Sequence, residues 1–451
     1  MTRTVRTLTT GLALAAGLGI AAPVAAMDKE ITIGHLTYHT GEFGAFGPFF
    51  DGVTEMVLSK INQDPPLGMT MRAIHQDIGT VGEARAARKL VDSDGVQILL
   101  NPAHSYLSYR EFMLETVAEN NLPLMPSVHG GAIEGAIGGV SNEPIFRGSP
   151  LDTANGVAGM NHAKEVGKGS VGEIATEVAG SQLQKDAALA AAGALGLEVL
   201  GDFDIEAGQG NYRSVVSRVN RLAPDAVIAF TSPNVGGSLV KNAAESGASW
   251  YIVGSGEWQE TEFYDTATVS ALNQHEAVVF AANAHAENDA WAPFEAFATA
   301  SEWAEDIGDV SNSYVIQYFD LLVSTALAIE KAGELNTESW TQAMYDITGG
   351  EGEVVYTYAD GLAALRAGKD INYDGVTGSM EYTNTGVVSG LFGIFTWDEG
   401  NLSQVAIVDG DRVLEIDAMS ASCAVTISAG WPWAGLRTFQ REFNVNSEPA
   451  T

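Results

Sequence analysis

Short apolar runs alternate with longer stretches of helical period from Ile31 onward, and this alternation constrains the fold more than any other feature of the chain. The run at residues 31–36 predicts a strand. The stretch that follows it spaces its apolar residues by three or four, at Phe46, Phe50, Val53, Val57 and Ile61. Such a stretch predicts a helix with one apolar face that packs on a sheet. Repeated strand and helix pairs are typical of βα units and a parallel sheet.

The alternation of strands and helices forms two successive series of βα units, one on each side of residues 146–150. Strands are predicted at residues 31–36, 69–75, 96–100, 122–127, 171–176, 197–203, 225–230, 250–254 and 277–281. Helices are predicted at residues 81–91, 106–120, 152–166, 182–195, 212–222, 235–246, 291–307, 313–332 and 337–347. After a glycine-rich break at 349–352, strand-like pieces at 378–382, 391–397 and 404–408 show no further βα rhythm. The sequence therefore predicts an α/β protein of two domains, both revisited near the end of the chain.

The first 26 residues have the pattern of a secretory signal peptide. Arg3 and Arg6 form a positive start, residues 11–22 form a short apolar core, and small residues at 24–26 precede a cleavage point before Met27. The apolar run is rich in alanine and glycine and is too weak for a spanning helix. We expect an exported, soluble protein whose mature chain begins at Met27.

The net charge limits the binding partners that can be expected, and the cysteine content limits the possible covalent links. The whole chain has a formal net charge of −34, and removal of Arg3 and Arg6 leaves 21 basic against 57 acidic residues. Nucleic acid and anionic membrane surfaces are poor partners for such a field, so we expect neither. Cys423 is the single cysteine, which excludes an internal disulfide and a lipid anchor at the mature start.

Recognisable catalytic and cofactor motifs are absent from the sequence. His35 and His39 are four residues apart, but on a strand and loop this spacing is not expected to bring two imidazoles together, so no metal site is predicted. The glycine pairs at 130–131 and 349–350 do not open a helix after a strand, and no GxSxG sequence occurs. We predict no cofactor and no enzymatic activity, with a secreted hydrolase as the less favoured alternative.

Polar and aromatic residues gather in loops after the predicted strands, where an open α/β sheet binds ligands. These loops cover residues 38–46, 101–106, 127–131, 176–181, 231–234 and 255–258. Hydroxyl groups and backbone donors suit a carboxylate, a carboxylate suits an ammonium group, and aromatic rings suit an apolar body. The loops predict a small polar ligand held between two lobes.

Several of these segments resemble the substrate-binding proteins of branched-chain amino acid type ABC transporters. The segments are ITIGHLTYHTGEFGAFG, LLNPAHSYLS, NLPLMPSVHGG, IFRGSPLD, DAVIAFTSPNVGGSLVKNAAESG, YVIQYFDLLVSTALAIEKAG and INYDGVTGSMEYTNTGVVSG. The resemblance extends from Ile31 to about Val408 and implies a type I periplasmic binding protein fold, in which a hinge joins two lobes of parallel sheet flanked by helices. It implies lobe one at residues 27–147 and 283–347, lobe two at 148–282 and 348–408, and leaves 409–451 as a C-terminal arm.

The resemblance also implies roles for individual residues. Ser105 matches a serine that holds the ligand carboxylate, Glu257 matches an acidic residue that pairs with the ligand amino group, and Phe46 matches an aromatic contact. Departures from the family pattern occur in the same region: Gly131 replaces a hydroxyl residue and Ala179 an aromatic one, while His104 and His129 enter the pocket. The expected ligand-binding residues are Phe46, His104, Ser105, His129, Gly130, Gly131, Ala179, Ser232, Glu257 and Trp258.

These features predict a periplasmic receptor that closes on an amino acid-like or related organic solute and delivers it to ABC permease subunits, as a monomer. A ligand-sensing module of the same fold is the main alternative, because the sequence does not separate transport from sensing.

Overall fold

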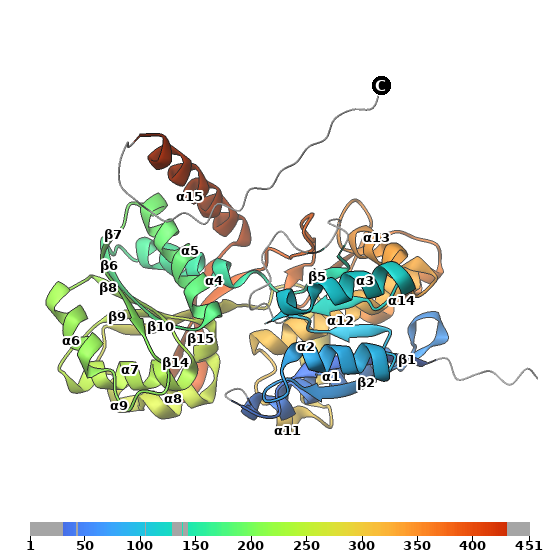
Figure 1. Cartoon of the computed structure of the whole chain (residues 1–451), viewed down its shortest axis with the longest axis horizontal. Helices are drawn as coiled ribbons and strands as arrows, with labels where there is room; N and C mark the ends of the chain where they lie inside the picture. Colours follow the sequence, from blue (N-terminus) through green and yellow to red (C-terminus); the bar gives the residue numbers. More distant parts are fainter. Residues whose placement is uncertain (1–29, 42–43, 104, 129–137, 139–142, 431–451) are drawn as a thin grey trace, which may run out of the picture.

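The computed structural model describes residues 30–41, 44–103, 105–128, 138 and 143–430. Within these residues the chain forms two α/β lobes that lie side by side (Figure 1). The predicted α/β class and the parallel strand pairing in both lobes are confirmed. The predicted signal peptide lies outside the described residues.

The first lobe is built on a parallel sheet in the order β2-β1-β3. These strands are β1 (Glu30–Thr37), β2 (Thr70–Asp77) and β3 (Ile98–Leu100). The sheet continues where the amide of Leu99 donates to the carbonyl of Leu124 at 2.8 Å, and then into the parallel pair β4 (Met125–Ser127) and β5 (Ile145–Arg147). The carboxyl ends of β1 and β5 both lead toward the second lobe.

Alternation of side chains along β1 gives the first sheet two apolar faces. Ile31 and Ile33 belong to a core shared with α1 (Gly47–Ile61) and α12 (Ser313–Ala332), whereas Leu36 belongs to the opposite core. The opposite core is covered by α2 (Glu83–Arg88), its π-helical continuation Lys89–Ser93 and α3 (Arg110–Asn120). Helix α12 matches the predicted range of 313–332, and Ser313 and every residue from Val315 to Ile329 are buried.

The second lobe contains a seven-stranded sheet in the order β15-β14-β10-β9-β8-β6-β7. Its parallel strands are β6 (Ser170–Thr176), β7 (Glu198–Ile205), β8 (Ala226–Phe230), β9 (Tyr251–Gly254) and β10 (Ala277–Asn283). The edge strands β14 (Phe392–Asp398) and β15 (Asn401–Val408) are antiparallel.

Helices cover both faces of this sheet. Val171 and Ala175 of β6 pack in one core with α4 (Asp152–Glu165) and α5 (Ala179–Leu195), and Ile174 packs in the other with α6 (Arg213–Leu222) and α7 (Pro233–Glu245). Two short helices, α8 (Thr261–Ala267) and α9 (Val269–Leu272), precede β10. The carboxyl ends of β6, β8 and β9 therefore lead into loops at the edge that faces the first lobe.

The return segment differs from the expected assignment. We expected residues 348–408 to join the second lobe without βα rhythm, but β11 (Glu353–Val355), α14 (Tyr358–Arg366) and β12 (Ile371–Gly375) form a parallel βαβ unit. This unit, followed by β13 (Gly378–Ser379), packs in the core of the first lobe through buried residues as far as Val388. Only from Phe392 onward does the chain belong to the second lobe. The chain thus crosses between lobes after Phe146, after Ala282 and after Val388.

Two further helical predictions need correction. The helix expected at 291–307 is two helices, α10 (Trp291–Thr299) and α11 (Ala304–Ile307), while α13 (Thr337–Thr348) extends one residue beyond its prediction. The expected C-terminal arm begins as a helix, α15 (Gly410–Gly430), whose Val413 and Ile416 are buried against the second lobe. Residues 431–451 lie outside the described residues.

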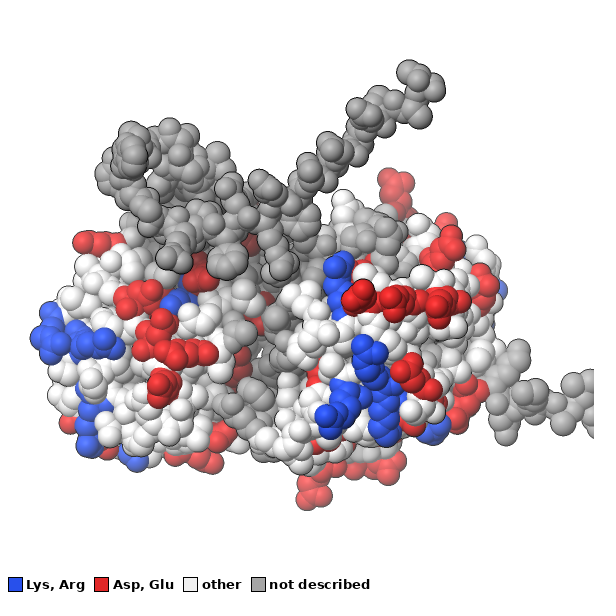
Figure 2. All heavy atoms as spheres, in the orientation of Figure 1, with Lys and Arg blue, Asp and Glu red and all other residues white. Residues whose placement is uncertain are grey.

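The surface agrees with the acidic composition. In Figure 2, acidic and basic side chains are interspersed on the visible face, with uncharged surface between them and a hollow where the two lobes meet. Among the described residues, no helix has the length and apolar character needed to cross a membrane.

Candidate functional site

A cavity of about 300 Å³ lies between the two lobes. The first lobe lines it through residues at the end of β1, in α1 and at the start of α12. The second lobe lines it through the loops that follow β6, β8 and β9. This is the edge at which the carboxyl ends of parallel strands commonly bind ligands.

Aromatic rings form the wall on the first lobe. The ring of Phe50 stacks on Phe46, with ring centroids 5.6 Å apart, and meets Tyr314 edge-on at 5.5 Å. Tyr38 completes this wall. Phe50 lies on the buried face of α1, and the 3₁₀ helix Gly44–Phe46 before α1 brings Phe46 beside it. This wall suits an apolar or aromatic ligand body.

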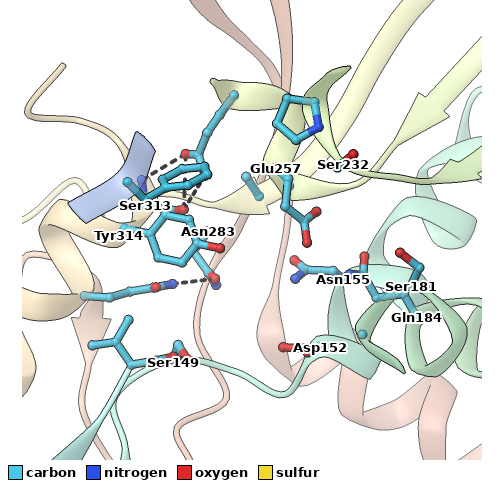
Figure 3. A pocket seen from close by; sticks show the side chains of 18 of the residues that line it. Ser149, Asp152, Asn155, Ser181, Gln184, Ser232, Glu257, Asn283, Ser313 and Tyr314 are labelled. Atoms are coloured by element: carbon cyan, nitrogen blue, oxygen red, sulfur yellow. Dashed lines mark hydrogen bonds between the residues drawn. The ribbon is translucent and has the colours of Figure 1, made fainter. Parts of the chain in front are cut away.

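The wall on the second lobe is polar. Asn155 projects from the first turn of α4, Gln184 from the second turn of α5, and Glu257 from the short 3₁₀ helix Gly256–Gln259. Figure 3 shows the carboxylate of Glu257 pointing into the space between Tyr314 and Asn155. One side-chain oxygen of each of these three polar residues is buried and has no hydrogen-bond partner within the described part of the chain. Such atoms are costly to leave unmatched, which favours a ligand with hydrogen-bond donors.

Arg147 lies at the first crossing between the lobes and is only 3% exposed. Its Nη2 donates to Oδ1 of Asp152 at 2.7 Å, and its Nε donates to the hydroxyl of Ser149 at 3.1 Å. Its Nη1 is buried and has no hydrogen-bond partner among the described residues. Because Arg147 and Asp152 neutralise each other, Glu257 supplies the net negative charge of the cavity lining.

Burial raises the pKa of Glu257 above the usual range of a glutamate, and the nearby carboxylate of Asp152 raises it further. Desolvation disfavours the ionised form of a carboxyl group, so a cation beside Glu257 would favour that form again. The site is therefore electrostatically suited to the cationic part of a ligand.

Hydrogen bonds join the two lobes at one side of the cavity. Gln259 donates to the hydroxyl of Ser313 at 2.9 Å and accepts from the amide of Ser313 at 3.1 Å. Gln317 donates to the side-chain carbonyl of Asn283 at 2.6 Å. The first two contacts hold the 3₁₀ helix that carries Glu257 against the start of α12, and the third joins α12 to the end of β10.

The structure brings three of the expected site residues together at the cavity: Phe46, Ser232 and Glu257. Ser105 is not among the residues that line it; Ser105 is exposed, and its amide donates to Glu83 at 3.0 Å. Trp258 also points away from it. Its indole is fully buried, stacks on Phe263 at 4.4 Å and donates to Thr231.

The remaining expected residues are not placed. His104, His129, Gly130 and Gly131 lie outside the described residues. Ala179 begins α5, but its side chain also lies outside the described part.

Sequence reasoning missed Arg147, Asn155, Gln184 and Tyr314 as lining residues. Arg147 belongs to the segment IFRGSPLD, which signalled the crossover but gave no sign that its guanidinium would turn into the cavity. The other three residues lie within the first two turns of helices: Asn155, Gln184 and Tyr314. There the periodicity of the sequence indicates packing and gives no sign of contact with a ligand.

The histidines of the first strand and loop share a partner that the sequence did not indicate. His35 and His39 both lie near Asp51, with Oδ1 3.8 Å from Nδ1 of His35 and Oδ2 2.7 Å from Nε2 of His39. The spacing of four does not produce this convergence on its own; helix α1 supplies the shared carboxylate.

A family described as periplasmic binding protein matches residues 30–398. No curated protein matches the chain at a significant level. The branched-chain amino acid transporter substrate-binding protein LivJ from Streptococcus pneumoniae, solved with isoleucine, is 17% identical with a TM-score of 0.65, and the match covers 84% of this chain and 99% of that chain.

Two other solved structures share the fold. A solute-binding protein from R. palustris, in complex with benzoate, is 14% identical with a TM-score of 0.62, and the match covers 84% of this chain and 96% of that chain. A fatty acid transporter substrate-binding protein from Thermomonospora curvata is 18% identical with a TM-score of 0.60, over 86% and 94% of the two chains. At these identities the similarity shows the two-lobed fold, which the sequence predicted.

Proposed function

The chain belongs to the periplasmic binding protein family, and on that premise we propose that it is the solute-binding protein of an ABC transporter. It binds a small organic solute between its lobes in the periplasm and delivers it to the permease subunits. The described cavity supports binding without covalent chemistry, so we expect no catalytic turnover. The observation that carries this proposal is the partly buried Glu257, whose Oε2 has no hydrogen-bond partner among the described residues and faces an aromatic wall across the cavity.

The charges of the lining favour an amino acid-like solute. A ligand ammonium group would pair with Glu257, and Nη1 of Arg147 remains to meet a carboxylate. The aromatic wall formed by Phe46, Phe50 and Tyr314 would cover the body of the solute. A volume of about 300 Å³ is at the lower end of the range for small-molecule pockets, which matches a solute of amino acid size.

A binding screen tests the proposal. The mature protein is titrated with amino acids, with amines that lack the carboxylate and with carboxylic acids that lack the amine, and its melting temperature is recorded. We expect the amino acids to give the largest stabilisation, the amines a smaller one and the acids none. Equal stabilisation by acids without an amino group would contradict the role of Glu257.

Glu257→Gln keeps the shape of the side chain and removes its charge. We expect this variant to bind the best solute at least ~100-fold more weakly, because an unpaired ammonium left in a desolvated site costs about 3 kcal/mol or more. Glu262→Gln, on the exposed surface of α8, is the matched control. Turnover of the solute by the wild-type protein, or uptake that does not depend on it, would refute the assignment to transport.

A further inference from the structure

Two histidine side chains and one aspartate side chain meet at the carboxyl end of the first sheet. The parallel register of β1 and β2 pairs His35 with His75, and their Nδ1 atoms are 2.8 Å apart. Helix α1 brings Oδ1 of Asp51 to 3.1 Å from Nδ1 of His75 and 3.8 Å from Nδ1 of His35. Three atoms that can each donate a lone pair therefore face one point.

We propose that His35, His75 and Asp51 form a binding site for a divalent transition-metal ion of the zinc class. Zinc binds imidazole nitrogen and carboxylate oxygen at about 2.0–2.2 Å in tetrahedral geometry, so two ligand atoms are expected about 3.4 Å apart. The three separations lie on both sides of this value and require only small side-chain adjustments.

The groups around the three ligands orient them toward the ion. Nε2 of His75 lies 3.0 Å from Oε1 of Glu55, and Nε2 of His35 lies 3.2 Å from the hydroxyl of Tyr318. When these outer nitrogens carry the protons, both Nδ1 lone pairs point inward. Partners of this kind, and carboxylates above all, are the usual outer support of a metal-binding histidine.

Two inward lone pairs cannot face each other at 2.8 Å without a positive charge between them. A proton on one ring would satisfy only that contact, and Oδ1 of Asp51 would still be buried without a hydrogen-bond partner in the part of the chain that the structure describes. A divalent ion satisfies all three atoms. Nitrogen and oxygen donors of this set suit zinc, cobalt, nickel or copper better than calcium or magnesium, which take oxygen ligands.

One side of the proposed metal site is buried and the other is open to solvent. The side chain of His35 is fully buried, whereas those of His75 and Asp51 are 20% and 23% exposed. His39 is more exposed and binds the second carboxylate oxygen of Asp51 at 2.7 Å. The fourth coordination position is filled from this open side by water or by His39.

Coordination would tie β1, β2 and α1 together, which gives a stability readout that does not depend on any solute. The mature protein, treated with a chelator and dialysed, is titrated with Zn(II) alone by calorimetry and by thermal unfolding. We expect one ion per chain and a higher melting temperature. Replacement of Zn(II) by Co(II) should give the visible absorption of a tetrahedral nitrogen and oxygen site.

Two variants locate the ion. His75→Gln removes one ligand and should weaken Zn(II) binding by about 100-fold or more, while His39→Gln, at an exposed position, should weaken it by about 10-fold. His285→Gln, at a histidine that stacks on Trp291 away from the cluster, is the control and should bind as the wild type does. The circular dichroism of each variant in chelator establishes that it folds. Absence of Zn(II) binding at micromolar concentration by the wild type, or wild-type affinity in His75→Gln, would overturn the proposal.

Discussion

Replacing Glu173 by glutamine is expected to stabilise the second lobe, and by more as the pH rises. Glu173 lies in the middle of β6, between Asp202 of β7 and Ile228 of β8, and its side chain is fully buried. Neither carboxylate oxygen has a hydrogen-bond partner within the described residues. Burial, with repulsion from Asp202 as a smaller cause, raises the pKa of Glu173 to about 9, and Lys185 offsets part of this.

The size and sign of the effect follow from the difference between the pKa of Glu173 in the folded state and its pKa in the unfolded state. The folded protein keeps a proton on Glu173 up to about pH 9, whereas the unfolded chain loses it near 4.5, the ordinary pKa of a glutamate. A group whose pKa is raised by folding stabilises the folded state fully below its unfolded pKa, and this stabilisation is lost as the pH rises through the folded pKa. At pH 7 the loss amounts to about 3 kcal/mol, since each pKa unit corresponds to about 1.4 kcal/mol.

Urea unfolding of Glu173→Gln and of the wild type, followed by circular dichroism between pH 5 and pH 8, measures this difference. Glutamine does not titrate, so the free energy of unfolding of the variant minus that of the wild type should rise by about 1.4 kcal/mol per pH unit. Glu198→Gln, at an exposed position on β7, is the control and should show no such slope. A difference that stays constant from pH 5 to pH 8 would refute the argument that Glu173 is buried in its neutral form.

Two substitutions test packing and buried polar contacts elsewhere in the fold. Gly156→Ala would place a Cβ 2.2 Å from the carbonyl oxygen of Gln184, where α4 and α5 approach closely. It should lower the free energy of unfolding, measured in urea, by about 1–3 kcal/mol. Unchanged stability would mean that the two helices can move apart without cost. Asp320→Asn would place an amide against the donors of Thr377, whose backbone and hydroxyl groups both bond to Oδ2 of Asp320 at 2.7 Å. The substitution should lower the free energy of unfolding by about 3 kcal/mol and speed the hydrogen exchange of backbone amides in β12. Exchange as slow as in the wild type would disprove that Asp320 anchors this strand.

The long helices and strands were predictable because the apolar residues that recur at helical or strand spacing are also the residues that are buried. Helix α12 was found at its true ends, since its apolar positions recur at helical spacing and a glycine follows Ala332. The βαβ unit of residues 353–375 escaped notice because its strands are short and only partly apolar. Its place depends on hydrogen bonds to Asp320, a residue that the periodicity of α12 identifies only as part of a helix.

The site was only partly predictable. Glu257 and Phe46 were expected from resemblance to a family, and both line the cavity. Trp258 was misassigned, because a Cβ at Gly254 or Gly236 would meet its indole within 2.3 Å, and such close packing cannot be read from one sequence. The histidine cluster was missed for a similar reason: 40 residues separate His35 from His75, and only strand register brings them together.

The same two elements of the structure carry both cavity-lining side chains and hydrogen bonds between the lobes. The 3₁₀ helix Gly256–Gln259 carries both Glu257, which faces the cavity, and Gln259, which bonds to Ser313 of the other lobe. The first turns of α12 likewise carry Tyr314, which lines the cavity, and Gln317, which bonds to Asn283. A solute that contacts Glu257 and Tyr314 therefore draws together the segments that the interlobe hydrogen bonds join. If these contacts are complete only when the lobes are closed, as in the proposed function, the solute would favour the closed state by its difference in affinity for the two states. In the proposed transport function, this difference would let the permease distinguish the loaded receptor from the empty one.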